Sequence, residues 1–452
     1  MKDPMRASAP LALLLLGLAT VLPSPASADP VDDFVQAEAL AQKIPGVSIA
    51  VVRNGEVIKA QGYGLANVEW NAAATPETLF QAGSVGKQFT ATLTMMLVEE
   101  GKLGLDDPVS KYIPGTPKSW KGITVRHLLT HTSGISNGLY DKINMRQDYS
   151  EDELIKQIIS VPLDFRPGEK WSYSNPGYVT LGILIHKATG TFYGDLLRER
   201  IFTPLGMSTA RIINEADIVL RRAAGYRLKD GELKNQEWVS PALNTTADGS
   251  LYMTVLDLAK WDAALYTEKL LKQSSLQQMW TPVKLKSDQP TQYGFGWFIT
   301  EARGHRLIEH SGAWQGFKAH IARYVDDKLT IIVMANLAQA NPGKIAHGLA
   351  GLYNAELTPP QRKAIQINPA IFDAYVGEYE LRPDFVLKVF REGDRFWTQA
   401  TGQPRIEVFA ESETQFFPTV IEAHLTFVKD TNGKVTHLVL HQQVDHRARK
   451  IK

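Results

Sequence analysis

The sequence contains no cysteine, which excludes disulfide bonds and thiolate catalysis from all of its 452 residues. It also lacks an excess of charge, since 49 basic residues stand against 48 acidic ones. Nucleic-acid binding needs Lys and Arg concentrated on one face to neutralise phosphates, so we expect no nucleic-acid partner. A chain of this length without disulfides is expected to rely on a conventional hydrophobic core in a large domain, with room for a second unit.

Long apolar runs are scarce, and the one near the N-terminus is short. Residues 11–22 are apolar, but as a helix they would rise only about 18 Å, less than the ~30 Å of bilayer hydrocarbon. Basic residues precede this run and the small residues Ala26-Ser27-Ala28 follow it, which is typical of a secretory signal peptide. We therefore expect residues 1–28 to be a signal peptide, the chain to be exported to the periplasm or secreted, and no stable membrane anchor.

Strand patterns occur at both ends of the first 356 residues, and helical patterns fill the middle. Residues 46–64 predict a β-hairpin around Asn54-Gly55, and residues 84–100 predict a helix. Further strands are expected at 294–299, 318–324 and 329–335, with a helix at 344–353. This order predicts an α+β fold for residues 29–356, with an antiparallel sheet flanked by helices and an all-helical insertion.

A second unit is predicted after a polar, proline-containing linker at residues 357–370. Short alternating segments follow it, and Asn432-Gly433 is a strong hairpin turn. The expected strands are 387–390, 395–399, 406–409, 424–429 and 434–441. Residues 371–452 are therefore predicted to form a separate all-β domain, a small barrel or sandwich.

The first chemical pattern is Ser84-Val85-Gly86-Lys87, at the start of the predicted helix. Residues three apart share one face of a helix, so Lys87 can lie beside the Ser84 hydroxyl. A serine hydroxyl needs a base to take its proton, and a buried lysine has a lowered pKa that suits it to that task. The free N–H groups of a helix N-terminus can also stabilise a developing oxyanion. A Ser-x-x-Lys pattern alone is weak, because chance supplies about one in such a chain.

Two companion motifs strengthen the interpretation. Tyr173-Ser174-Asn175 is the one Tyr-x-Asn in the chain, and His310-Ser311-Gly312 is the one His-x-Gly. In this order the three motifs resemble the serine β-lactamase and penicillin-binding family, in its class C-like branch with D-stereospecific peptidases and β-lactamase-like esterases. Similar stretches are residues 126–135, 293–297 and 312–317. The resemblance covers about residues 35–355 and implies a β-lactamase/transpeptidase-like fold. Residues 375–379, 402–404 and 413–417 resemble the lipocalin-like β-barrel often attached to such hydrolases.

The resemblance also implies roles for single residues. Ser84 would be the nucleophile, Lys87 its base or proton relay, and Tyr173 a second proton-transfer group polarised by Lys87. Asn175 would hydrogen-bond the substrate's amide or the Lys87 ammonium, and His310, Gly312 and Ala313 would bind the substrate. The backbone N–H groups of Ser84 and Ala313 would form the oxyanion hole.

One position departs from the β-lactamase pattern, in which a lysine usually opens the third motif. His310 has an unperturbed pKa near 6.5 and is mostly neutral at pH 7, so it holds a carboxylate less well than lysine does. It could instead hydrogen-bond Tyr173 or the substrate, or be a strand histidine satisfied by local hydrogen bonds. Efficient β-lactam hydrolysis is therefore not expected.

Other chemistries fit less well. His127 and His131 are four residues apart, but residue 128 is leucine where a zinc-protease helix has glutamate. Ala82 occupies the position of the first glycine in the Gly-x-Ser-x-Gly nucleophile elbow of α/β-hydrolases. No metal or cofactor is expected.

The sequence thus predicts a serine hydrolase that forms an acyl-enzyme at Ser84 with a small-molecule or peptide substrate, either an ester or an amide of a D-amino acid. The alternative is a cell-envelope penicillin-binding module or weak β-lactamase that acylates with slow turnover. The oligomeric state is left open.

Overall fold

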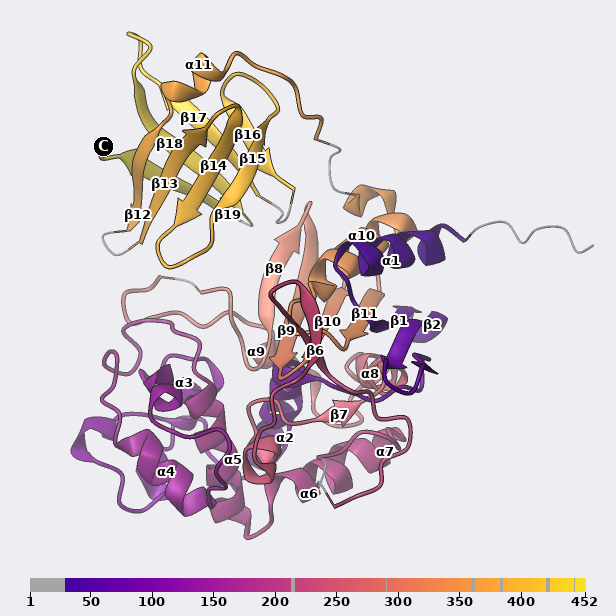
Figure 1. Cartoon of the computed structure of the whole chain (residues 1–452). Helices are drawn as coiled ribbons and strands as arrows, with labels where there is room; N and C mark the ends of the chain where they lie inside the picture. Colours follow the sequence, from indigo (N-terminus) through magenta and orange to yellow (C-terminus); the bar gives the residue numbers. More distant parts are fainter. Residues whose placement is uncertain are drawn as a thin grey trace, which may run out of the picture.

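The computed structural model describes residues 29–212, 216–289, 291–358, 362–382, 385–419, 423–442 and 444–452. The predicted signal peptide lies outside the described residues. The larger part of the chain is built on a seven-stranded antiparallel sheet with the order β3-β2-β1-β11-β10-β9-β8 (Figure 1). Its strands are β1 (Gly46–Arg53), β2 (Glu56–Asn67), β3 (Ala72–Ala73), β8 (Phe298–Ala302), β9 (His305–Trp314), β10 (Phe317–Tyr324) and β11 (Leu329–Ala335). The predicted antiparallel sheet is confirmed.

The first hairpin forms where its turn residues predict it. Asn54 and Gly55 both have positive φ, 53° and 80°, which is the requirement of the tight turn that joins twisted strands. β1 then pairs on its other side with β11, with Val47 opposite Ala335. Segments from the two ends of the domain therefore lie side by side at the centre of the sheet.

Each face of the sheet is covered by helices. α1 (Pro30–Ala41) and α10 (Pro342–Tyr353) pack on one face (Figure 1). α2 (Lys87–Glu99), α8 (Val255–Ala264) and the central helices cover the other. Side chains alternate along a strand, so in β9 Leu307 joins the cluster under α10 while Ile308 joins the larger opposite core.

The sequence predicts an all-helical central region, and helices are its main regular elements. It contains α3 (Val125–Leu129), α4 (Glu151–Ile159), α5 (Asn175–Thr189), α6 (Tyr193–Leu197), α7 (Thr203–Leu205) and α9 (Gln273–Met279). It also holds two small antiparallel pairs, β4 (Phe80–Gln81) with β7 (Tyr252–Met253) and β5 (Tyr226–Lys229) with β6 (Glu232–Asn235).

Two local predictions need correction. The helix expected from residue 84 begins with the 3₁₀ turn η1 (Gly83–Gly86), and α2 starts at Lys87. The strand expected at 294–299 is a turn up to Gly296, and β8 begins at Phe298. Gly296 has a φ of 77°, and a Cβ there would lie 2.8 Å from the Lys87 carbonyl oxygen. The glycine thus lets this turn pack directly on the start of α2.

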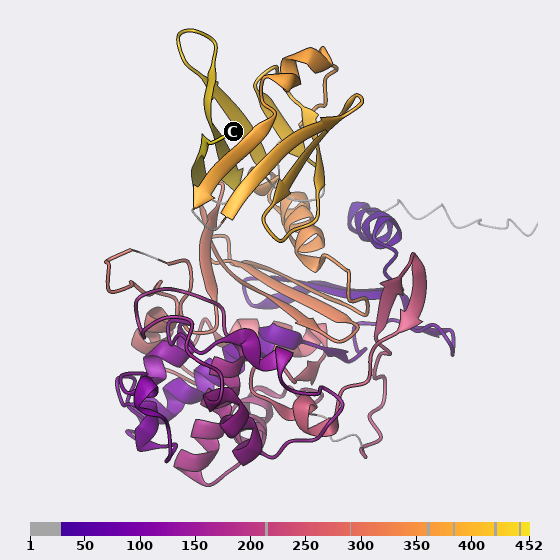
Figure 2. The ribbon, with the colours of Figure 1, turned by 60° about the vertical axis from the view of Figure 1, so that its left-hand side comes forward.

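The C-terminal part is a closed eight-stranded barrel (Figures 1 and 2). Its strands are β12 (Gly377–Arg382), β13 (Phe385–Glu392), β14 (Arg395–Ala400), β15 (Ile406–Ala410), β16 (Gln415–Pro418), β17 (His424–Lys429), β18 (Val435–Gln442) and β19 (Val444–Lys450). The short helix α11 (Pro369–Asp373) supplies Phe372, which stacks on Phe396 at 4.2 Å between ring centroids and belongs to the barrel core. Aromatic side chains fill this interior.

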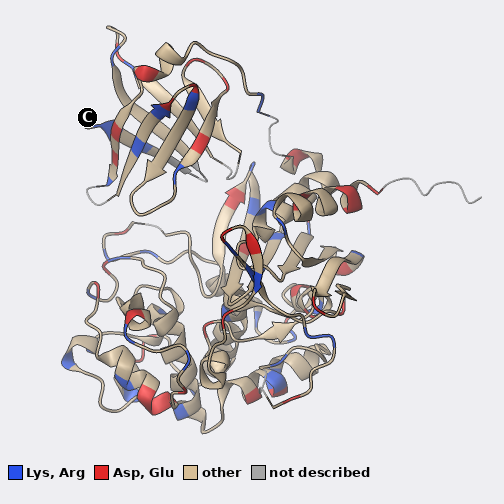
Figure 3. Ribbon diagram, in the orientation of Figure 1, with Lys and Arg blue, Asp and Glu red and all other residues tan. Residues whose placement is uncertain are grey.

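Charged side chains of both signs are interspersed over the ribbon (Figure 3). On the barrel they pair across short distances, for example Arg391 with Asp373 at 2.7 Å. Among the described residues, no helix is both long and apolar enough to cross a membrane.

Candidate active site

Ser84 lies in a 3₁₀ turn pressed against strand β9. Gly83 has a φ of 54°, and a Cβ at that position would lie 2.5 Å from the backbone nitrogen of Ala313. A Cβ on Gly312 would lie 1.9 Å from the carbonyl oxygen of Ala82. Two glycines therefore permit a backbone approach that no larger residue allows, and it brings the Ser84 turn beside Ala313.

Lys87 lies behind Ser84 and is completely buried. Its Nζ is 3.0 Å from Ser84 Oγ, 2.8 Å from Asn175 Oδ1 and 2.5 Å from the backbone oxygen of Asp248. Burial lowers the pKa of Lys87 to about 7, against the opposing charge of Asp248. A sizeable fraction of the lysine is therefore neutral at physiological pH.

The three partners of Lys87 fix how the neutral amine is oriented. The oxygens of Asn175 and Asp248 can only accept hydrogen bonds, so they take the two N–H groups of a neutral amine. Its lone pair is then directed at Ser84 Oγ. Ser84 is partly exposed, whereas Lys87 is completely buried. The serine is therefore accessible from solvent and the lysine is not.

Tyr173 and Asn175 lie at the start of α5, where Ser174 caps the helix by accepting from the Gly177 N–H at 3.0 Å. Burial raises the pKa of the Tyr173 phenol, and interaction with Ser84 opposes part of that rise. The buried hydroxyl has no hydrogen bond of good geometry to any described residue. Lys87 Nζ lies 4.8 Å from the centroid of the Tyr173 ring, so the lysine meets the face of the ring.

His310 lies on β9 and is buried. Its Nδ1 is 2.6 Å from the Ser311 carbonyl oxygen, and its Nε2 is 2.9 Å from the Tyr293 hydroxyl. Burial, with the charge of Lys87, lowers the pKa of His310 to about 3. Because a carbonyl can only accept, Nδ1 carries a proton and donates. With the imidazole neutral, Nε2 has no proton and accepts from the Tyr293 hydroxyl. Both ring nitrogens are thus engaged within the protein.

Two further site residues escaped the sequence interpretation. Asp248 gives Lys87 its third hydrogen-bond acceptor, and His131 packs on Tyr173 at 4.2 Å between ring centroids. His131 Nδ1 accepts from the Ser174 N–H at 3.1 Å, whereas His127 Nδ1 contacts the Thr124 hydroxyl that caps α3. The two histidines therefore serve separate turns. The stretch 126–135 resembles the family in sequence, but nothing in it points to a contact with Tyr173.

Of the residues singled out from the sequence, Ser84, Lys87 and Asn175 are joined by hydrogen bonds. Tyr173 adjoins Lys87, and its ring centroid is 6.1 Å from that of His310. Gly312 and Ala313 line the other side of the Ser84 turn. The structure thus brings these residues together around one serine.

Comparison with known proteins defines the class of this site. Residues 31–354 match the Beta-lactamase family, and the chain belongs to that family. Residues 361–452 match a domain of unknown function, DUF3471. The family, together with relatives that include an aminopeptidase and an amidase, makes the chain a hydrolase of the β-lactamase type.

Particular relatives carry two kinds of name. The chain is 31% identical over 407 residues to penicillin-binding protein 4* of Bacillus subtilis, covering 84% of this chain and 89% of that protein. It is 28% identical over 342 residues to a D-aminopeptidase of Gluconobacter oxydans, covering 74% of this chain and 63% of that protein.

Solved structures give the same picture. The octameric penicillin-binding protein homologue from Pyrococcus abyssi aligns with a TM-score of 0.66 at 28% identity, over 93% of this chain and 99% of that one. The D-amino acid amidase from Ochrobactrum anthropi aligns with a TM-score of 0.63 at 26% identity, over 72% of this chain and 99% of that one.

Proposed function

We propose that the protein forms an acyl-enzyme at Ser84 with esters or with amides and peptides of D-amino acids, and then hydrolyses it. The observation that carries this proposal is the 3.0 Å contact between Ser84 Oγ and the buried Lys87 amine, whose pKa is about 7. A base with a pKa near the working pH is the most effective proton acceptor. The signal-peptide pattern of residues 1–28 supports export as the setting of this activity.

In the acylation step, Ser84 Oγ attacks the substrate carbonyl carbon while its proton passes to Lys87 Nζ. The negative charge that develops on the carbonyl oxygen would be held by the N–H groups of Ser84 and Ala313. The bond between the carbonyl carbon and the leaving group then breaks, and the leaving atom takes a proton from the Tyr173 hydroxyl. Lys87 then passes the proton it took from Ser84 to Tyr173. In the second step, water attacks the acyl-enzyme ester by the same route, which releases the acid and restores Ser84.

The raised pKa of Tyr173 suits it to this donor role, because the phenol stays protonated until a basic leaving atom appears. Asn175 holds the Lys87 amine in place by its 2.8 Å contact. His310 hydrogen-bonds the Tyr293 hydroxyl, and the Tyr293 ring packs edge-on against Tyr173, so His310 helps to position Tyr173.

The preference for esters and D-amino acid derivatives over β-lactams has two supports. The His310-Ser311-Gly312 motif offers no fixed cation for the carboxylate of a β-lactam antibiotic. Both ring nitrogens of His310 are already hydrogen-bonded, to Ser311 and to Tyr293. Similar proteins are named D-aminopeptidase and D-amino acid amidase. A substrate panel of p-nitrophenyl acetate, D-alanine p-nitroanilide and nitrocefin tests this order. Sustained turnover of nitrocefin above the other two would contradict it.

A penicillin-binding module with slow turnover is the second candidate, because the 31% identical relative bears that name. The two candidates differ in the fate of the acyl-enzyme. The hydrolase gives a steady rate after any burst, whereas the binding module stops after one equivalent of product per chain.

The pH dependence of acylation is expected to follow Lys87. The neutral amine is the active form, so the rate should rise with pH through an apparent pKa near 7. Asn175→Asp places a negative charge 2.8 Å from Nζ, which favours the ammonium and should move the acid limb to higher pH. Asp248→Asn removes a charge that now raises the lysine pKa, and should move the limb to lower pH.

These opposite shifts are measured as pH profiles of kcat/KM for the same ester. Shifts in the same direction, or none in either variant, would show that Lys87 does not set the acid limb.

Tyr173→Phe is expected to distinguish amide from activated ester. A p-nitroanilide nitrogen must be protonated to leave, whereas p-nitrophenolate leaves without a proton. The variant should therefore lose about 10²-fold in kcat/KM on D-alanine p-nitroanilide and much less on p-nitrophenyl acetate. Tyr178→Phe is the matched control, because it also removes a buried phenol hydroxyl, one that donates to the Leu129 carbonyl at 2.9 Å. Equal losses on both substrates would place Tyr173 in serine activation instead.

A further inference from the structure

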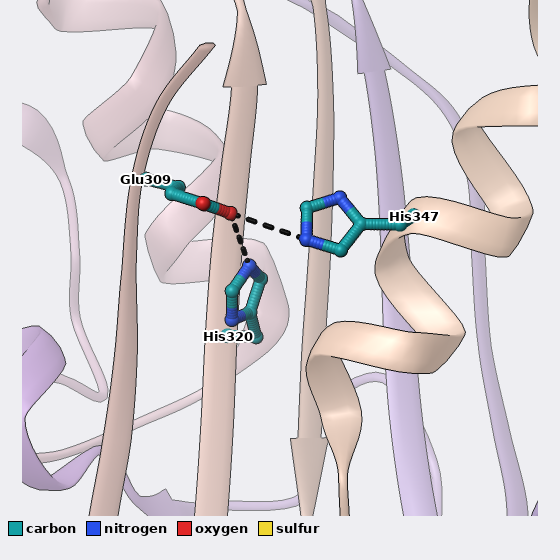
Figure 4. Close-up of side chains that lie close together, drawn as sticks. All are labelled: Glu309, His320 and His347. Atoms are coloured by element: carbon teal, nitrogen blue, oxygen red, sulfur yellow. Dashed lines mark hydrogen bonds and ion pairs between the residues drawn. The ribbon is translucent and has the colours of Figure 1, made fainter. Parts of the chain in front are cut away.

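Strand β9 carries a second polar cluster on the face opposite the catalytic residues. Glu309 directly precedes His310, and strand alternation turns its side chain toward α10. There it meets His320 of β10 and His347 of α10, as Figure 4 shows. None of these three residues has a part in the proposed catalytic steps.

The three side chains converge on one point. Glu309 Oε2 lies 2.9 Å from His320 Nε2 and 3.3 Å from His347 Nε2, and the three ligand atoms all lie within 4.8 Å of one another. A tetrahedral zinc ion with bonds near 2.0–2.1 Å keeps its ligand atoms about 3.3 Å apart. The cluster therefore needs only small side-chain rotations to surround such an ion.

The donor set is that of a borderline divalent metal. Two imidazoles and one carboxylate form a common three-ligand zinc set, with water completing the tetrahedron. His347 Nδ1 lies 2.8 Å from the Tyr324 hydroxyl, a partner that can orient the ring and fix its tautomer. The His347 side chain is 29% exposed, which gives an ion a path to the otherwise buried group.

The cluster also has the charge that a cation needs. Glu309 is buried, and one oxygen of its carboxylate contacts both His320 and His347. Without a metal, both Nε2–H groups must donate to a single carboxylate oxygen. With a metal, each imidazole carries its proton on Nδ1, and the two Nε2 lone pairs face the ion.

We propose that Glu309, His320 and His347 bind one Zn²⁺-class divalent ion that clamps helix α10 to the strand carrying His310. The ion would hold α10 against β9 and β10 on the face of the sheet opposite Ser84. Its binding is independent of the proposed acyl-enzyme chemistry.

The test uses the full chain without an affinity tag, freed of metal by chelator and dialysis. Titration with Co²⁺ alone should give the intense visible bands of four-coordinate cobalt, saturating at one ion per chain. Zn²⁺ should displace it and raise Tm by roughly 3–6 °C at about 100 times Kd.

The variants decide between a metal site and a purely hydrogen-bonded cluster. His347→Ala, on the outer helix, should weaken Co²⁺ binding by at least about 10²-fold, and Glu309→Gln should do the same. His186→Ala is the matched control, since His186 pairs with the single carboxylate of Glu151 and should leave binding unchanged. Absent cobalt bands, or binding that survives His347→Ala, would overturn the proposal. Ser84 labelling does not enter either outcome.

Discussion

Replacing Ser84 with alanine is expected to lower kcat on both p-nitrophenyl acetate and D-alanine p-nitroanilide by about 10⁴-fold or more. The variant keeps Lys87, Tyr173 and the oxyanion donors, but no atom remains to form the covalent bond. Ser84 is partly exposed, so the loss of one hydroxyl should leave Tm nearly unchanged. Steady-state kinetics on both substrates, with thermal melts of each protein, make the measurement.

The matched control is Ser133→Ala, which removes a buried serine from a neighbouring loop. Ser133 Oγ accepts from the Ile135 N–H at 3.2 Å and has no contact with Lys87 among those described. A fluorophosphonate probe should label the wild type and Ser133→Ala, but not Ser84→Ala. Equal activity of Ser84→Ala and wild type would remove Ser84 from the mechanism.

Lys87→Met is expected to cost about 10³-fold in kcat/KM on the same two substrates. Methionine matches the length of the buried stem but has no lone pair for the Ser84 proton. The variant leaves the Asn175 and Asp248 oxygens without a donor, which costs stability. It also removes a buried amine, which restores stability. We therefore expect a small change in Tm, and a rate that no longer shows an acid limb near pH 7.

Lys318→Met is the control for a change of this kind. Burial also lowers the pKa of Lys318, but its side chain belongs to the face of β10 turned away from Ser84. It should keep wild-type kinetics and the wild-type pH profile. A Lys87→Met enzyme that retained both would show that another group accepts the Ser84 proton.

The parts of this fold set by local chemistry could be predicted from the sequence. Asn54-Gly55 determines its turn because both residues accept positive φ. The β11 strand is predicted with its observed bounds because residues 329–335 are an unbroken β-rich run. Ser84 and Lys87 are three residues apart, and in a 3₁₀ turn that spacing places them on one edge. Their contact therefore survives the change of helix type.

The parts set by tertiary contact were missed. Gly294 to Gly296 looked like a strand, but close packing on the Lys87 backbone makes a turn of it. Three barrel strands, β12, β16 and β19, are not predicted from the sequence. β16 has four residues and ends on a proline, and β12 alternates over only six residues. They are held by their neighbours once the barrel closes.

Side chains distant in sequence form the rest of both clusters. Asp248 reaches Lys87 across 161 residues, through a backbone oxygen that no motif can encode. Glu309, His320 and His347 come from two strands and a helix. Their meeting requires the pairing of β9 with β10 and the packing of α10 against them.

The most direct measurement is the position of the acyl group during turnover. The protein would be mixed with p-nitrophenyl acetate, quenched in acid during the burst, and analysed by intact mass and peptide fragmentation. The mechanism predicts one acetyl group per chain, carried by the Ser84 oxygen and absent from Ser84→Ala. Acetyl found on another side chain, or a full burst from Ser84→Ala, would contradict it.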